Sequence, residues 1–423
     1  MRRPLRERLP PRWVVVVSLA VAASILGDSL LYAVLPVVWQ DLGIAVGAVG
    51  VLLSVNRFVR LASNPVAGWV VARTGIRVPF LAALFVAALT TAAYASGLGF
   101  VVLLLARALW GACWSFLRLG GFMAALDAAH DGRRGYYLGF FNGVTRLGSF
   151  VAVLTGGLLT DLLGFETTAL LFAALSLLGA LGVVRERPPA PRRLPEPTRP
   201  AHAEHPPAAP RRPPRPDRVR FAVVSTAVFL HGLAISGLVT ATLGLWLLRA
   251  YGKTTSVLGL AVGVATITGV LLSARFLGDF LWGPIVGHLA DRWGPVRVTL
   301  TAGAIEAGAL AMLALPVALV WTAATAVVLF LASTALQVSL DTTAGGLAPP
   351  QRRARTLGWY TTWLDLGAAA GPLLGYAIGG GQHLAWLYLA AGAALALVGI
   401  VYVAVFTGLV RPALPEAESS RPS

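Results

Sequence analysis

The sequence predicts an all-α integral membrane protein in which 12 transmembrane helices form two pseudo-symmetric six-helix bundles. Of the 423 residues, 57% are hydrophobic and 12% are charged, and this charged share is about half that of a typical soluble protein. The apolar residues gather in long runs, and an α-helix needs about 20 such residues to cross a membrane. The pattern also repeats once along the chain, which favours a tandem duplication.

The repeat is carried by glycines and charged residues at one constant spacing. Gly68, Arg73 and Gly75 lie 219 positions before Gly287, Arg292 and Gly294. Further landmarks correspond at the same offset, namely Asn64-Pro65 with Gly283-Pro284, and Arg133-Arg134 with Arg352-Arg353. One offset that holds over such distances predicts two halves of similar fold.

Each half contains six apolar runs, which we interpret as helices with ends defined to within several residues. In the N-terminal bundle, 1–184, they lie at roughly 13–39, 46–71, 78–97, 99–126, 136–160 and 165–184. In the C-terminal bundle, 221–410, they lie at roughly 221–249, 256–288, 296–315, 317–345, 356–378 and 384–410. The first run is longer than the apolar core of a signal peptide, so we interpret it as the first span.

Two segments outside the bundles are polar. Residues 185–220 are rich in proline and arginine, and such a composition cannot form a hydrophobic core, so we expect a disordered cytoplasmic linker. Residues 411–423 are expected to form a disordered tail.

Positive charge is distributed unevenly between the joints of the predicted helices. Basic residues collect on one side, in the linker and at Arg2, Arg3, Arg6, Arg8, Arg12, Arg73, Arg77, Arg133, Arg134, Arg292, Arg297, Arg352, Arg353, Arg355 and Arg411. The opposite joints carry Asp41, Asp161, Glu166, Gln382 and His383, with Arg249 and Lys253 as basic exceptions. Because basic joints stay in the cytoplasm, we expect both termini there, in a multi-pass protein of the cell membrane. The formal charge of +16 then reflects topology rather than a nucleic-acid partner.

One joint in the second half carries a recognisable motif. Residues 287–297 have the form Gly-x-Leu-Ala-Asp-Arg-x-Gly-x-x-Arg, which resembles the loop signature of the major facilitator superfamily. In that family the full signature lies between helices 2 and 3, and a degenerate copy lies between helices 8 and 9. Here the second copy is complete, whereas the first has Ala72 in place of the acidic residue. The residues that carry the resemblance are Gly68, Arg73, Gly75, Gly287, Asp291, Arg292, Gly294 and Arg297.

The resemblance covers nearly the whole chain and implies two bundles that rock against each other around a central cavity. Ionisable side chains inside membrane spans are costly and are therefore candidates for function. In this chain they are Asp28, Arg57, Arg60, Arg107, Arg118, Arg146, His231, Arg275, Asp279, Glu306, Asp341 and Asp365.

Four of these charges predict a gate between the halves. At the repeat offset Arg60 corresponds to Asp279 and Arg146 to Asp365. In the fold that the resemblance implies, helix 2 packs against helix 11 and helix 5 against helix 8. We therefore expect the ion pairs Arg60 with Asp365 and Arg146 with Asp279 to close the inner side. Alternatively, Arg275 and Asp279 neutralise each other on one helix, and Arg146 binds a carbonyl.

Six residues are candidates for coupling to protons or for contact with a solute. The resemblance places helices 1, 4, 7 and 10 around the cavity, and their charged members are Asp28, Arg118, His231 and Asp341. Burial in an apolar environment favours the protonated form of a carboxylate, so Asp28 is expected to be a proton- or cation-coupling group or a structural partner of Arg57. His231 is either a titrating group or a hydrogen-bonded core residue.

Arg107 lies in a Leu-x-x-x-Arg-x-x-x-Gly motif that runs from Leu103 to Gly111. This motif is similar to one on helix 4 of the family, where the arginine is associated with proton coupling and with contacts to helix 1. An equally good interpretation is that Arg107 binds backbone carbonyls and fixes helix 4.

The predicted helix 11 contains small residues at regular spacing: Gly367, Gly371, Pro372 and Gly375. Such spacing allows two backbones to approach closely. The motif looks like the antiporter signature of the family, which belongs on helix 5. The helix 5 counterpart in this chain has no proline.

The sequence contains no phosphate-binding loop, no zinc-ligand spacing and no nucleophile set with a base, and its one cysteine, Cys113, excludes a disulfide framework. We therefore expect no enzyme activity and no cofactor. The expected function is secondary active transport of a small organic or amphipathic solute by a monomer, through proton-coupled export. A lipid or lysolipid translocator and a metabolite importer remain alternatives, as does a non-transporting membrane sensor or scaffold.

Overall fold

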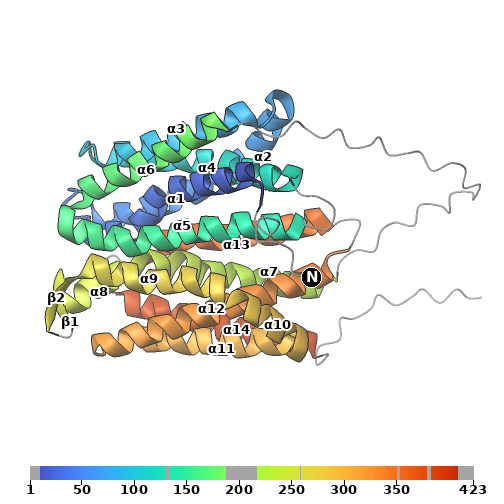
Figure 1. Ribbon diagram of the computed structural model, residues 1–423. Coiled ribbons are helices and arrows are strands. Elements are labelled where there is room, and N and C mark those ends of the chain that lie inside the picture. Colours follow the sequence, from blue (N-terminus) through green and yellow to red (C-terminus); the bar gives the residue numbers. More distant parts are fainter. Residues whose placement is uncertain are drawn as a thin grey trace, which may run out of the picture.

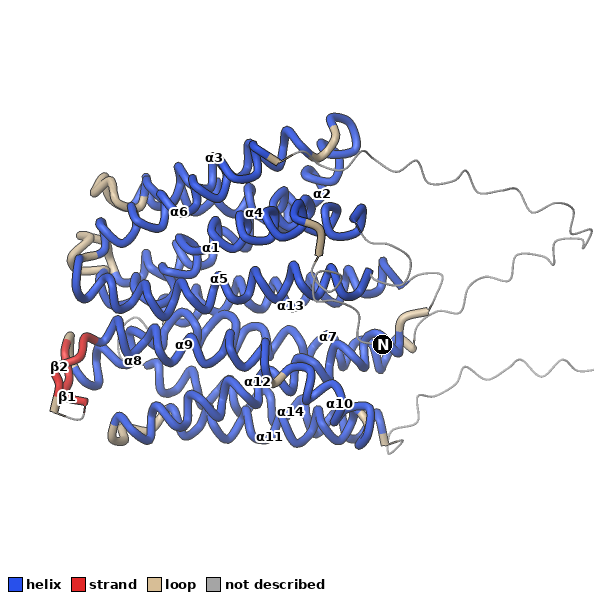
Figure 2. The backbone as a smooth tube through the Cα atoms, in the orientation of Figure 1, coloured by secondary structure: helices blue, strands red, loops and turns tan. Residues whose placement is uncertain are grey.

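The computed structural model describes residues 10–128, 134–186, 217–257, 259–349, 353–378 and 383–407, and these are nearly all helical (Figures 1 and 2). The first half contains α1 (Arg12–Val38), α2 (Val46–Thr74), α3 (Arg77–Ala93), α4 (Phe100–Ala128), α5 (Arg134–Leu163) and α6 (Phe165–Arg185). The second half contains α7 (Arg218–His231), the π-helix η2 (Gly232–Val239), α8 (Thr240–Tyr251), β1 (Thr254–Val257), β2 (Leu260–Gly263), α9 (Val264–Leu281), α10 (Gly283–Trp293), α11 (Pro295–Leu313), α12 (Leu319–Leu347), α13 (Arg353–Ala377) and α14 (Leu384–Phe406).

Within the described residues, 10 helical segments are long and apolar enough to cross a membrane, with α7, η2 and α8 taken as one. The apolar helix α3 is shorter, at 17 residues. The count of 12 crossings and the cytoplasmic termini stay predictions. The linker at 187–216, the tail at 411–423 and the basic residues Arg2, Arg3, Arg6, Arg8, Arg133, Arg352 and Arg411 lie outside the described residues.

The prediction of one continuous helix over residues 256–288 is wrong. Its first residues belong to an antiparallel hairpin in which Thr254 pairs with Gly263, and the helix begins only at Val264. It is also interrupted at Trp282 before α10 begins, where Pro284 occupies one of the first helical positions. Proline has no N–H to donate to the preceding turn, so a helix tends to break or begin at that point.

Most residues of the loop motif lie in helices rather than in the loops between them. Gly68 and Arg73 lie in the last turns of α2, and Gly287, Asp291 and Arg292 lie in α10. The backbone reverses only at the two later glycines of the repeat, Gly75 and Gly294, with φ of 75° and 84°. Glycine is favoured at such helix ends because it lacks a Cβ, so both copies end their helices by the same device.

The two halves share one hydrophobic core at one end of the molecule and have separate cores at the other. We call the end that carries β1 and β2 the hairpin end, and the end where α1 begins the terminal end (Figure 1). The shared core joins residues such as Leu35 of α1 and Leu243 of α8. Towards the terminal end one core, around Leu117, belongs to the first half, and another, around Leu340, belongs to the second. The halves are therefore packed together at the hairpin end.

The glycines of α13 allow its backbone to contact the π-helical segment. A Cβ at Gly367 would overlap the backbone of α7 and its extension at Phe229 and Leu233, and one at Gly371 would overlap Gly237 and Leu238 of η2. Pro372 lies inside α13, and its carbonyl faces Gly50 of α2 in the other half. This stretch of α13 is thus held between η2 and the first half.

We expect Gly371→Leu to destabilise the fold, because overpacking a close helix contact costs about 1–3 kcal/mol or more. The control is Gly308→Leu on α11, an exposed position where an added Cβ has no neighbouring atom within 4 Å. Thermal unfolding of the detergent-solubilised protein, followed by size-exclusion chromatography, measures the difference. Equal midpoints for the two variants would contradict the close packing of α13 against η2.

Candidate functional site

A buried cluster of charged and polar side chains joins α1, α2 and α4. Arg107 forms an ion pair with Asp28, and Asn56 donates a hydrogen bond to the same carboxylate oxygen at 2.7 Å. Nε of Arg107 also donates to the carbonyl of Leu52 at 2.9 Å. The side chain of Arg107 is 0% exposed and that of Asp28 is 8% exposed. The expected contact of Arg107 to helix 1 and its expected bond to a backbone carbonyl are therefore both present, and its role in proton coupling stays a prediction.

Asp28 is consequently not a lone carboxylate, and its partner is Arg107 rather than Arg57. The two residues of the ion pair are 79 positions apart in the sequence. The cluster continues through Tyr32, four residues after Asp28 and hence on the same face of α1. Tyr32 receives a hydrogen bond from Nε of Arg57 at 3.3 Å and donates one to the carbonyl of Leu53 at 3.2 Å.

Arg60 does not form the expected pair with Asp365. Its guanidinium lies over the rings of Trp110 and Trp114 of α4, at 5.6 and 5.5 Å from their centroids, and these rings are stacked on each other. Nε of Arg60 is buried without a hydrogen-bond partner among the described residues. The side chain of Arg60 thus packs within its own half, against an aromatic surface that attracts cations.

The second expected pair is present across the two halves. Arg146 of α5 forms an ion pair with Asp279 of α9, and the side chains are 51% and 19% exposed. Thr334 of α12 donates to the other carboxylate oxygen of Asp279 at 2.8 Å. Arg275 does not bind Asp279 but donates to the hydroxyls of Ser236 and Thr240.

The second half contains a buried histidine–glutamate pair that joins α7 to α11. Nδ1 of His231 lies 3.1 Å from both carboxylate oxygens of Glu306, and the side chains are 4% and 0% exposed. His231 is the last residue of α7 before the π-helix η2. Of the two roles expected for His231, the hydrogen bond is present.

Within the described residues, the remaining two candidates form no hydrogen bond or ion pair with these clusters, although Asp341 lies within electrostatic reach of His231 and Arg146. Asp341 of α12 accepts hydrogen bonds from Gln337 and from the hydroxyl of Tyr360, both at 2.6 Å. Arg118 of α4 is exposed and lies over the ring of Phe122 at 5.5 Å. The structure therefore brings Asp28, Arg57 and Arg107 together and leaves Asp341 and Arg118 elsewhere.

Sequence reasoning missed several partners. Asn56 is a polar residue inside an apolar run, next to Arg57, and this position could have identified it as a member of the buried cluster. Ser236 and Thr240 gave no comparable signal, because serine and threonine hydroxyls in a helix often bond to their own backbone. The π-helix has no recognisable sequence pattern.

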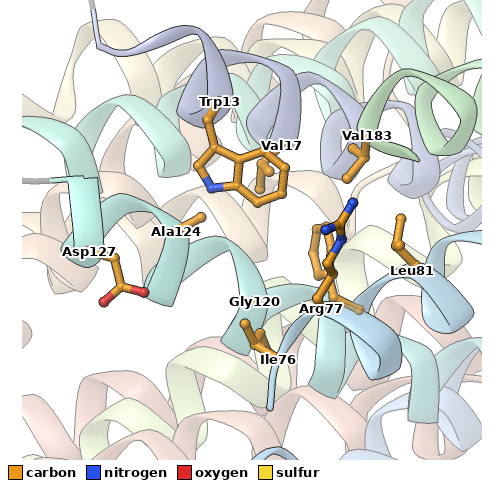
Figure 3. A pocket seen from close by; sticks show the side chains of 10 residues that line it. Trp13, Val17, Ile76, Arg77, Leu81, Gly120, Ala124, Asp127 and Val183 are labelled. Atoms are coloured by element: carbon orange, nitrogen blue, oxygen red, sulfur yellow. The ribbon is translucent and has the colours of Figure 1, made fainter. Parts of the chain in front are cut away.

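A pocket in the first half lies away from all these residues. It is lined by residues of α1, α3, α4 and α6, among them Trp13, Arg77 and Asp127 (Figure 3). Its volume of ≈ 60 Å³ leaves room for only a few water molecules. It is too small for an organic solute.

The apolar helices, the two packed halves and the charges between them define a multi-pass membrane protein with a transporter fold. The family model of the Major Facilitator Superfamily matches residues 17–280 and 262–423. The chain belongs to this superfamily, whose members are transporters and not enzymes.

One curated relative and several solved structures are similar to the chain. The vesicular acetylcholine transporter of Drosophila melanogaster is 30% identical over 135 residues, which span 32% of this chain and 23% of that relative. Three solved structures share the fold. A POT family transporter in complex with 5-aminolevulinic acid has a TM-score of 0.77 at 13% identity, covering 95% of this chain and 97% of that chain.

The second is a bacterial homolog of the human lysosomal transporter Spinster in an inward-facing, occupied conformation, with a TM-score of 0.68 at 15% identity, covering 97% of each chain. The third is a mutant of the nucleoside transporter NupG, with a TM-score of 0.70 at 12% identity, covering 93% of this chain and 100% of that chain. At these identities the likeness is one of fold.

Proposed function

We propose that the chain is a monomeric secondary active transporter of the cell membrane that exports a small organic or amphipathic solute in exchange for protons. The observation that carries the proton coupling is the buried pair of Asp28 and Arg107. A proton on Asp28 removes the negative charge that compensates Arg107, so the cluster gains a net positive charge inside the bundle. An uncompensated charge at this depth is costly, so either the two halves move relative to each other or Asp28 releases its proton.

The cluster is connected to the surfaces at which the halves meet. α1 packs against α8 and α9, and α2 packs against α13, so two of the three helices that carry the cluster contact the second half. The shared core at the hairpin end and the separate cores at the terminal end support a conformation closed at the hairpin end. If the termini are cytoplasmic, this conformation is the inward-facing state of an alternating-access cycle.

The Arg146–Asp279 pair acts in this cycle as a contact between the halves. It is present together with the closed hairpin end, so it does not by itself mark the outward-facing state. The proposed gate does not include a pair of Arg60 with Asp365, because Arg60 packs against Trp110 and Trp114.

Proton flux in proteoliposomes tests the proposal. The purified protein is reconstituted with the pH dye pyranine trapped inside and a pH gradient imposed. Three probes of similar size are added in turn: the anion phenylphosphonate, the cation phenyltrimethylammonium and the neutral benzyl alcohol. We expect at least one probe to cause proton flux across the membrane and to be transported against its own concentration gradient. Asp28→Asn should reduce this flux to that of empty liposomes, because asparagine keeps the hydrogen bonds but binds no proton.

The matched control is Glu166→Gln, which removes an exposed carboxylate in the first turn of α6. We expect this variant to transport like the wild type. Unchanged proton flux in Asp28→Asn would contradict the coupling role. Absence of flux for every probe would favour a non-transporting sensor.

A further inference from the structure

The charges at the interface between the halves do not balance. Within the described residues, Asp28 is neutralised by Arg107 and Asp279 by Arg146. The arginines Arg57, Arg60 and Arg275 then remain without a carboxylate in ion-pair contact. They come from both halves, since Arg57 and Arg60 lie on α2 and Arg275 lies on α9.

These three arginines lie near one another. Arg57 and Arg60 lie three residues apart on α2 and therefore share a face of that helix, and Arg275 of α9 lies within electrostatic reach of Arg57 across the interface. Asp365 of α13 acts on Arg57 and Arg60 from a distance longer than an ion pair. Asp28 and Asp279 also act on the group, but each is already paired with Arg107 or Arg146. Within the described residues Asp365 is left as the acidic neighbour outside an ion pair, so the group carries a net charge of about two.

The hydrogen-bond partners of the group are neutral or missing. Arg57 donates to Tyr32, and Arg275 donates to the hydroxyls of Ser236 and Thr240. Nε of Arg60 is buried and has no acceptor among the described residues. A buried guanidinium N–H without an acceptor is unfavourable, so the group is suited to an oxygen-rich anion.

We propose that Arg57, Arg60 and Arg275 bind the anionic group of the transported solute. The inference rests on the proposed transport function and names its substrate class, an organic anion with a carboxylate, phosphonate or phosphate group. Guanidinium groups bind such oxyanions through paired N–H donors. The stacked rings of Trp110 and Trp114, beside Arg60, offer an apolar surface to the body of the same solute.

The position of the group suits a substrate site in a rocking mechanism. Arg57 is hydrogen-bonded to Tyr32, whose ring lies 5.6 Å from the guanidinium of Arg107, so the anion site contacts the proton site through one side chain. Arg275 holds η2 through Ser236 and the start of α8 through Thr240. An anion bound between Arg57 and Arg275 would therefore join α2 of one half to α9 of the other.

Binding to the purified protein tests the site without transport. The protein is placed in phosphatidylcholine nanodiscs, and phenylphosphonate, phenyltrimethylammonium and benzyl alcohol are titrated separately. We expect phenylphosphonate to quench tryptophan fluorescence and raise the thermal unfolding midpoint. The cation and the alcohol should bind at least about tenfold more weakly, a difference of about 1.4 kcal/mol. Equal binding of the three probes would overturn the proposal.

Two double variants and one control assign the binding to these arginines. Arg57→Gln with Arg60→Gln should abolish the response to phenylphosphonate, whereas Arg57→Lys with Arg60→Lys should keep part of it. Arg77→Gln removes one arginine at the distant pocket of Figure 3 and should leave binding unchanged. An unchanged response in the double glutamine variant would contradict the site, and if that variant is misfolded, the charge preference of the wild type decides.

Changing the lipid composition of the nanodisc tests whether the anionic group belongs to a lipid or to a water-soluble solute. If phosphatidylglycerol in the nanodisc competes with phenylphosphonate, the anionic group belongs to a lipid; if it does not, the solute is water-soluble. The proton-flux assay separates this inference from the proposed function. If phenylphosphonate binds but no probe produces flux, the proposed transport function is wrong and the anion site stands. If the cation produces flux that persists in the double glutamine variant, the anion site is wrong and the transport function stands.

Discussion

Replacing Arg107 by methionine is expected to lower the free energy of unfolding by about 3–5 kcal/mol, because it leaves the buried carboxylate of Asp28 without its counter-charge. Methionine fills a similar volume, so the loss reports charge more than packing. The side chain of Arg107 is fully buried, which removes the screening that weakens surface pairs. Titration with sodium dodecyl sulfate in mixed micelles measures the change.

A second variant separates charge from shape. Asp28→Asn combined with Arg107→Met removes both charges and leaves Asn56 able to bond to the new amide, so most of the lost stability should return. Arg118→Met, on the same helix but exposed, should change stability by about 0.5 kcal/mol or less. A double variant as unstable as Arg107→Met alone would show that the ion pair is not the cause.

Reversing either charge of the pair that joins α5 and α9 is expected to reduce transport by about tenfold or more. Arg146→Asp places two carboxylates in contact across the halves, and Asp279→Arg places two guanidiniums there beside Arg275. Like charges across an interface cost several kcal/mol, and this repulsion should shift the conformational equilibrium away from the closed contact. Solute-dependent proton flux in proteoliposomes measures the loss.

The reversed pair, Arg146→Asp with Asp279→Arg, should recover a large part of the flux. The comparison is the reversal Arg60→Asp with Asp365→Arg, which should recover nothing, because these two side chains form no ion pair. If the double reversal at α5 and α9 is no better than either single variant, the contact has no part in the cycle.

Much of the architecture could be predicted from the sequence because it depends on local pattern. The helical runs follow from apolar length, and the correspondence of Gly75 with Gly294 follows from the repeat, since both end a helix with a left-handed residue. The pair of Arg146 with Asp279 could be predicted only because the resemblance placed helix 5 beside helix 8.

The candidate site was less predictable because its contacts depend on which way each side chain turns. Asp28 was predicted to be a coupling group or a partner of Arg57, yet Arg107 and Asn56 both reach it from other helices. Arg60 was predicted to cross to Asp365, yet it turns to Trp110 and Trp114 in its own half. Helical spacing places a residue on a face, but the choice between partners on that face depends on packing.

The sequence by itself determined that this chain is a helical membrane protein with two related halves and a set of charges at membrane depth. Only the tertiary structure decided which polar side chains meet, with Asp28 paired to Arg107 and His231 hydrogen-bonded to Glu306, and which arginines remain without an ion-pair partner. The physical reason is that hydrophobic length is a property of each segment, whereas an ion pair needs two segments distant in the chain to meet within a few ångströms.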